Sequence, residues 1–276
     1  MELNKTLTLS TVSLASLMSF SVNALDWRIA FGGHDFIVEQ ESSHTFGADV
    51  HFSLAHLTQS NILLTASIDV LVDHDKDKLD PDHIPIWFMS NYMAKGELVS
   101  LSANSALMWE VELDGKRNTV SSVEKQVKLF PAISYEYNTE AFFAAVKGAA
   151  GYYFLEIDDD VPRLRGYDRE DFQNKTGAYS FAANTRIAMG KSMDLSLTAQ
   201  HWNDGDEWLE NKYGAALTYD SNFWIENSHL ALSVEHTEYN LDPYAKINVS
   251  DPDYLAILPW NNDTLVRLYI DMPWEF

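Results

Sequence analysis

The final segment of the chain alternates strictly between apolar and polar residues. From Val266 onward, the even-numbered positions carry Val, Leu, Ile, Met, Trp and Phe, and the odd-numbered positions carry Arg, Tyr, Asp, Pro and Glu. A period of two places the two sets on opposite faces of a β-strand. Because chain ends usually fray into water, a strand that ends with Trp274 and Phe276 on its apolar face predicts an apolar surrounding for that face.

Segments with the same strand-like pattern recur throughout the chain. Trp109 and Val111, for example, lie on either side of Glu110, so one face is apolar and the other is polar. We predict about twelve strands, at residues 26–36, 45–57, 62–72, 86–101, 106–113, 127–137, 141–155, 178–189, 194–202, 213–219, 229–239 and 264–276. Ten or fourteen strands stay open, because residues 86–113 and 115–127 contain few turn signals.

The connections between these segments differ in length in a regular way. Those after the odd-numbered segments are mostly long and polar, and they include residues 73–85, 114–126, 156–177, 203–212 and 240–263. Those after the even-numbered segments are mostly short, at residues 58–61, 102–105, 138–140, 190–193 and 220–228. Long loops on one rim, with short turns and both chain ends on the other rim, are typical of outer-membrane β-barrels.

These patterns predict the fold class. We expect an all-β protein that forms a single antiparallel transmembrane up-and-down β-barrel over residues 25–276. The barrel must close, since an open sheet edge in hydrocarbon leaves backbone N–H and C=O groups unpaired at a cost of several kcal/mol each. The first strand is therefore predicted to pair with the last strand.

The first 24 residues have the features of a secretory signal peptide. Lys5 precedes an apolar stretch at residues 6–22, and Val22, Asn23 and Ala24 fit the small-x-small cleavage rule. We expect cleavage after Ala24 and export from the cytoplasm through the inner membrane. An uncleaved membrane anchor is the less favoured alternative, because the apolar core is short and contains Ser and Thr.

Composition excludes several other classes of protein. The chain contains no cysteine, so a disulfide framework and a thiolate site are both excluded. No stretch after residue 24 reaches the roughly eighteen apolar residues that a transmembrane helix needs. The formal net charge of -22 argues against nucleic acid as a partner and against charge attraction to anionic lipid.

The end of the chain resembles the C-terminal signature of Gram-negative outer-membrane β-barrel proteins. Phe276 is the last residue, and Trp274, Met272 and Ile270 occupy the preceding alternate positions. The resemblance implies that these four residues are the signal read by the barrel-assembly machinery. It also implies location in the bacterial cell outer membrane, among outer-membrane lipid and lipopolysaccharide. In size the chain is similar to the solitary translocator barrels of autotransporters, and twelve-stranded nucleoside-type channels and oligosaccharide porins fit the same layout.

The alternation also predicts which charged side chains point into the barrel. Both signs of charge occur among the predicted lumen residues, which are Asp49, His51, Asp69, Glu110, Glu112, Lys128, Glu136, Lys147, Arg186, Glu235, Arg267, Asp271 and Glu275. These side chains either pair into a network that fills the interior, or remain hydrated and line a water channel with cation preference. Pairing is the interpretation that we favour at this stage.

The choice between paired and hydrated lumen charges separates two functions. A structural or autotransporter-translocator-like barrel without a passenger is the main expectation. A passive, cation-preferring diffusion channel (porin) for small solutes is the alternative, and a lipid hydrolase or protease with its site on the rim is less favoured. We expect no enzymatic activity and no cofactor.

Histidines near the long-loop rim are the candidate catalytic residues. They are His34 beside Asp35, His44 after Ser42 and Ser43, and His201 close to Asp204 and Asp206. A serine hydrolase needs Ser and His within hydrogen-bond reach and a third group that orients the His. The chain has neither a nucleophile elbow nor the His-Ser-Asn-Gly run of the barrel phospholipases. We therefore predict no catalytic residues.

Acidic residues in one predicted loop match part of a calcium-binding pattern. Asp73, Asp75 and Asp77 have the spacing of a calcium loop. Lys78, however, occupies the position that needs Gly, and Ile84 occupies the position that needs Glu. We therefore predict no metal site, and we expect these acidic loops to be solvated.

Overall fold

The computed structural model describes residues 25–38, 43–74, 86–118, 123–157, 173–221, 225–240 and 261–274. Residues 1–24, which we predict to be the signal peptide, lie outside the described residues, as do Glu275 and Phe276. Within the described ranges, no helix is long and apolar enough to cross a membrane.

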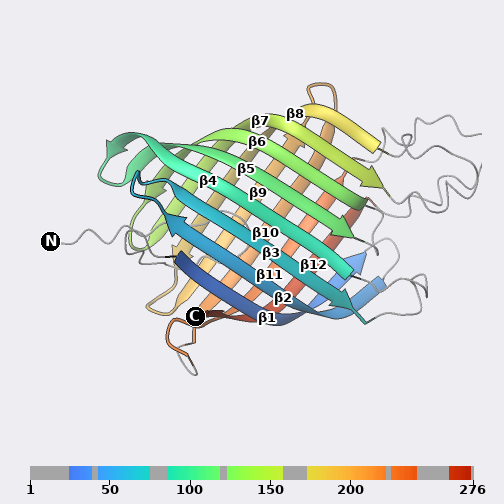
Figure 1. The fold of residues 1–276 in the computed structure, drawn as a ribbon, viewed down its shortest axis with the longest axis horizontal. Helices are drawn as coiled ribbons and strands as arrows, with labels where there is room; N and C mark the ends of the chain where they lie inside the picture. The colour runs from blue at the N-terminus through green and yellow to red at the C-terminus, as the bar shows by residue number, and fades with distance from the viewer. Residues whose placement is uncertain are drawn as a thin grey trace, which may run out of the picture.

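Twelve antiparallel strands in the described ranges form one closed barrel, which confirms the predicted fold class (Figure 1). Consecutive strands are neighbours around the whole ring. The strands are β1 (Leu25–Val38), β2 (Ser43–Leu57), β3 (Leu63–Asp73), β4 (Ile86–Ser102), β5 (Ser105–Asn118), β6 (Val123–Asn138), β7 (Phe142–Ile157), β8 (Gln173–Ala188), β9 (Met193–Asn203), β10 (Trp208–Asp220), β11 (His229–Tyr239) and β12 (Asn262–Pro273).

The ring closes where β1 pairs with β12, as the sequence predicts. The register of this seam runs from Arg28 opposite Pro273 to Ile37 opposite Thr264. Gly32 lies in the middle of the seam, where a Cβ atom on its backbone would come within 2.5 Å of both the Leu268 carbonyl oxygen and the Tyr269 Cβ. The absence of a side chain at this position therefore allows close packing on the inner side of the seam.

The two faces of the barrel wall differ as the alternation requires. On β12, Leu268 is 55% exposed, whereas Arg267 and Tyr269 on either side of it are buried. Other strands likewise expose large apolar side chains on the outside, among them Phe181 and Leu232. An apolar outer surface around a polar interior suits a barrel that is surrounded by lipid.

Several strands extend further than the sequence pattern predicts. β5 and β6 together cover most of the predicted connection at residues 114–126 and leave only residues 119–122 between them. In the same way, β9 and β10 reduce the predicted connection at 203–212 to residues 204–207. The expectation of long connections at these two places is therefore wrong. Most residues of these strand ends are polar, and apolar residues such as Trp208 and Leu209 follow one another without alternation, so a period-two pattern does not reveal the strands there.

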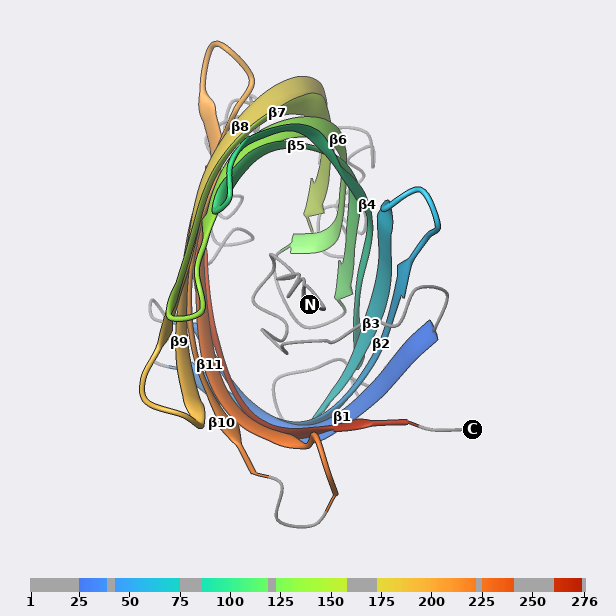
Figure 2. The same cartoon turned by 90° about the vertical axis from the view of Figure 1, so that its left-hand side faces the viewer.

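The barrel is an elongated ring when it is viewed from one end (Figure 2). β2, β3 and β4 lie on one long side of the ring, and β9, β10 and β11 lie on the opposite side. The shorter dimension of the lumen therefore separates these two walls, and long side chains from opposite walls are able to meet inside it.

Candidate functional site

The lumen is the candidate functional site because most of the chemically active side chains point into it. Among the predicted lumen residues, Glu136 and Glu235 are half-buried and Glu275 lies outside the described residues. The other predicted lumen residues are buried: Asp49, His51, Asp69, Glu110, Glu112, Lys128, Lys147, Arg186, Arg267 and Asp271. Most of these side chains belong to clusters of ion pairs.

One cluster surrounds Arg267 beside the seam. Its Nε lies 2.5 Å from Asp49 Oδ2, and its Nη2 lies 2.8 Å from Asp69 Oδ1. His51 Nδ1 lies 2.9 Å from the same Asp69 oxygen. These residues belong to β12, β2 and β3, which lie close together around the ring. The cluster therefore follows the wall and does not cross the lumen.

A second cluster joins neighbouring strands from β4 to β7. Lys147 Nζ lies 2.9 Å from Glu112 Oε2 and 3.3 Å from Glu110 Oε2. Lys95 forms an ion pair with Glu136, and its Nζ lies 3.6 Å from Glu110 Oε1. Each buried ammonium thus has a carboxylate partner, which a charge in a low-dielectric interior requires. This network also follows the wall.

Shorter pairs complete the charged lining of the wall. Arg28 Nε donates to Asp271 Oδ2 at 2.6 Å, and Arg28 Nη2 donates to the carbonyl oxygen of Asn227 at 2.9 Å, near the short-turn rim. Lys212 Nζ lies 2.8 Å from Glu235 Oε1 on the adjacent strand. Arg186 differs from these, because its Nε and Nη1 have no hydrogen-bond partner in the described part of the chain.

Lys128 and Glu210 form a pair that crosses the lumen. Lys128 Nζ on β6 lies 2.6 Å from Glu210 Oε1 on β10, and these strands are not neighbours. Gln126 Nε2 and the Tyr153 hydroxyl donate to the other Glu210 oxygen at 2.5 and 3.2 Å. The Lys128 ammonium also lies 5.5 Å from the centre of the Trp202 ring. This group of contacts narrows the interior.

Two clusters of apolar side chains lie inside the barrel toward the long-loop rim. The first packs side chains of β6 to β11 around Trp202, with Phe130, Tyr153 and Tyr239 among its members. The second, on β1, β3, β4 and β12, consists of Phe36, Leu71, Trp87 and Leu265, with Met89 packed against it. The clusters occupy opposite parts of the ring, so they reduce the lumen from two sides.

Lys116 lies between the two apolar clusters. Its Nζ donates to the Tyr239 hydroxyl at 3.2 Å and lies 3.7 Å from Asp263 Oδ2. The same ammonium lies 5.4 Å from the centre of the Trp87 ring and 5.7 Å from that of Tyr239. Lys116 extends from β5, whereas Tyr239 and Asp263 belong to β11 and β12 on the other side of the ring. These contacts form a second connection across the lumen.

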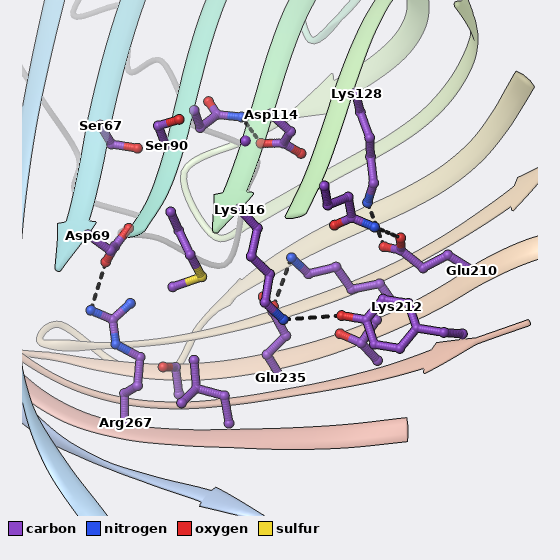
Figure 3. Close-up of a pocket in the computed structure, with 18 residues that line it drawn as sticks. Ser67, Asp69, Ser90, Asp114, Lys116, Lys128, Glu210, Lys212, Glu235 and Arg267 are labelled. Carbon is purple, nitrogen blue, oxygen red and sulfur yellow. Dashed lines mark hydrogen bonds and ion pairs between the residues drawn. The ribbon is translucent and has the colours of Figure 1, made fainter. Parts of the chain in front are cut away.

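A polar cavity of about 100 Å³ adjoins these cross-lumen contacts (Figure 3). Ser67, Asn91, Ser233 and Thr237 contribute uncharged polar groups to it. The charged residues of its lining are Asp69, Asp114, Lys116, Lys128, Glu210, Lys212, Glu235 and Arg267. A polar cavity of this size has room for water and offers it several hydrogen-bond partners.

Sequence reasoning missed several residues of this cavity. Lys116, Glu210 and Lys212 all fall in segments predicted to be connections, whereas the structure places them on β5 and β10. Extending the alternation of each strand would have found Lys116 and Lys212, because they share the parity of Glu112 and of inward positions further along β10. Lys95 and Arg28 lie within predicted strands and form buried ion pairs of the wall, but they are not among the predicted lumen residues.

The histidines that we considered for catalysis have other partners. His34 Nε2 lies 2.6 Å from Asp73 Oδ1 inside the barrel, and Trp87 Nε1 donates to the second oxygen of Asp73 at 2.8 Å. His44 Nδ1 lies 3.0 Å from Asp35 Oδ2. His201 Nδ1 lies 2.7 Å from Asn211 Oδ1 and does not contact Asp204 or Asp206 in the described chain, and Ser42 lies outside it.

The predicted acidic loops lie largely outside the described residues. Asp75, Asp77, Lys78 and Ile84 belong to that part of the chain. Asp73 is described, and its two oxygens are occupied by the His34 and Trp87 contacts. No group of three or more His, Cys, Asp or Glu in the described ranges has the geometry to hold a metal ion.

The closed twelve-stranded barrel, apolar outside and charged inside, has the fold of an outer-membrane β-barrel protein. The chain is similar to an outer-membrane channel from Pseudomonas putida F1, with a TM-score of 0.52 and 12% identity over 96% of this chain and 100% of that one. It is also similar to the KdgM porin (TM-score 0.47, 9% identity, 89% and 99% covered) and to outer membrane phospholipase A from Escherichia coli (0.43, 14%, 90% and 92%).

No protein-family model and no curated protein matches the chain. The identity to the outer-membrane channel is low, so this likeness shows the fold alone. The expectation of an autotransporter-like barrel gains no support from these comparisons.

Proposed function

We propose that this protein is a passive diffusion channel for small solutes in the bacterial outer membrane, with a preference for cations. The observation that supports this function best is the polar, charge-lined cavity inside a closed barrel. A structural barrel whose side chains filled the interior at the packing density of a protein core would leave no such space. The likeness in fold to an outer-membrane channel agrees with this function.

The arrangement of the ion pairs supports a pathway through the lumen. The Arg267 cluster, the Lys147 cluster and the pair of Lys212 with Glu235 join strands that are close together around the ring. Such pairs neutralise charge along the wall and do not themselves cross the lumen. Within the described chain, the contacts of Glu210 with Lys128, Gln126 and Tyr153 cross the lumen, and so do those of Lys116. They define a narrow section that restricts passage to small solutes.

The preference for cations follows from the balance of charges in the interior. Among the described residues, buried carboxylates outnumber buried lysine and arginine side chains. An interior with excess negative charge and low-dielectric walls concentrates cations and repels anions. The proposal includes no enzymatic step, cofactor or metal.

A structural barrel with a filled lumen, similar to a translocator domain, is the second candidate. The observation that favours it is the buried pair of Lys128 and Glu210, which connects opposite walls together with Gln126 and Tyr153. If such contacts close the lumen permanently, no solute passes.

The same proposal extends to partners of the barrel. Ile270, Met272, Trp274 and Phe276 would form the signal for the barrel-assembly machinery, and the outer surface would contact outer-membrane lipid and lipopolysaccharide. Of these residues, Trp274 is 38% exposed, as a side chain at the boundary of a membrane would be. Nucleic acid is not expected as a partner, given the net charge of -22.

Single-channel conductance of the refolded protein in a planar bilayer tests the proposed function. Folding is verified first by the shift in gel mobility between heated and unheated samples. We expect discrete open steps, and under a gradient of KCl we expect a reversal potential of the sign that cation preference produces. Silence from folded protein would contradict the channel and favour the filled barrel, and anion preference would contradict the assigned selectivity.

A further inference from the structure

Lys116 occupies a singular position in the described part of the lumen. Its side chain starts on one wall and ends near Tyr239 and Asp263 on the opposite wall. Figure 3 shows Lys116 pointing into the cavity. Lys128 also crosses the lumen, but it is fixed by a short ion pair with Glu210 at 2.6 Å. The contacts of Lys116 are longer, at 3.2 Å to a neutral hydroxyl and 3.7 Å to a carboxylate.

The surroundings of the Lys116 ammonium place it in a gap. Trp87 belongs to the apolar cluster on β1, β3, β4 and β12, and Tyr239 belongs to the apolar cluster on β6 to β11. The ammonium lies over both rings, at 5.4 and 5.7 Å from their centres. It therefore lies between two apolar groups that form separate clusters in the described chain, and it is bound there by cation–π contacts.

We propose that Lys116 is the residue that limits ion passage at the narrow section of this channel, both by its volume and by its charge. This inference rests on the proposed channel function and adds the residue that controls it. A lysine has a flexible four-carbon stem, so its head group is able to leave the gap when an ion passes. While it stays there, its positive charge repels cations in a region of low dielectric.

Lys212 provides a matched control. It lines the same cavity and carries the same charge, but its Nζ has a close carboxylate partner, Glu235 on the adjacent strand, at 2.8 Å. Lys116→Met and Lys212→Met both remove one positive charge and retain an unbranched side chain. A difference between the two variants therefore reflects the contacts of Lys116 with Trp87, Tyr239 and Asp263, and not the loss of one positive charge alone.

Conductance and reversal potential of the refolded full barrel are measured for both variants and for Lys116→Arg. We expect Lys116→Met to raise the single-channel conductance by about twofold or more and to strengthen cation preference, because the charges that line a narrow cleft set the local concentration of ions. Lys212→Met should change the conductance less. Lys116→Arg should resemble the unmodified protein, since arginine keeps the charge and the contacts with aromatic rings.

The outcomes separate this inference from the channel function. If the unmodified protein conducts and Lys116→Met conducts no better than Lys212→Met, Lys116 is not the limiting residue and the channel function stands. If the folded unmodified protein is silent but folded Lys116→Met conducts, the channel function is contradicted for the unmodified protein, and Lys116 is the residue that closes its lumen. If all folded variants are silent, the channel function itself fails, and this inference fails with it.

Discussion

Arg267 neutralises two carboxylates at once in the interior of the barrel. Its guanidinium contacts Asp49 and Asp69 at 2.5 and 2.8 Å, and all three side chains have little exposure. A planar guanidinium is suited to two partners in fixed directions, which an ammonium is not. The residue therefore controls the charge of the lumen wall beside the seam.

Arg267→Met is expected to destabilise the barrel strongly. The substitution leaves Asp49 and Asp69 buried close together without their cation, and removal of one partner of a buried pair typically costs about 3–5 kcal/mol. Urea unfolding of the refolded protein in lipid vesicles measures the loss. Adding Asp49→Asn and Asp69→Asn to the variant should restore much of the stability, since the uncompensated charges disappear.

Arg186→Met is the control for this prediction. Arg186 is as buried as Arg267, but its Nε and Nη1 have no hydrogen-bond partner in the described chain. Its replacement removes a poorly satisfied charge from the interior and should change stability much less. Equal losses for the two methionine variants would show that the paired carboxylates do not explain the effect at Arg267.

At the scale of strands, the seam between β1 and β12 depends on close packing at Gly32. A Cβ at this position would meet not only the β12 backbone but also Asp49 Oδ1, at 2.7 Å. The atoms involved are one backbone carbonyl oxygen and atoms of two buried side chains, Tyr269 and Asp49, so they have little freedom to move. Side-chain bulk at residue 32 would therefore separate the two strands that close the ring.

Gly32→Ala should therefore weaken closure of the barrel. We expect a lower urea midpoint, and earlier loss of the heat-modifiable gel shift as the temperature of the sample is raised. Gly148→Ala on β7 is the matched control, because a Cβ there has no atom within 4 Å. If both alanine variants have the same urea midpoint as the unmodified protein, the close approach at Gly32 has no energetic importance.

The strands also show how far the sequence determines the fold. Alternation predicts the twelve strands and closure wherever one face is apolar, as on β12. It fails at strand ends such as Asp114 to Asn118, because there both faces are polar and the pattern resembles a loop. The same failure conceals Lys116, whose importance depends on contacts with strands that are remote in sequence. The periodicity of one strand does not show which side chains of distant strands its residues contact across a closed ring.

At the scale of the whole molecule, the barrel separates two solvents. Its outer surface is apolar over most strands, while its interior is charged and largely neutralised by pairing. In a lipid barrel, the cost of a charge on the outer face depends on depth and is largest near the middle of the bilayer. A charge added to the outer surface should therefore reduce the stability of this protein most near the middle of the strands and least near the rims.

Leu268→Arg tests this dependence. Leu268 is an exposed residue near the middle of β12 and lies opposite Leu232 on β11, so it should lie deep in the hydrocarbon. We expect the substitution to reduce the free energy of folding into vesicles by about 2–4 kcal/mol. Asn104→Arg, in the exposed turn between β4 and β5, places the same charge near water and should cost about 0–1 kcal/mol. Equal costs for the two variants in urea titrations would contradict a lipid-facing wall, whereas a large difference would locate the bilayer on the barrel independently of any channel measurement.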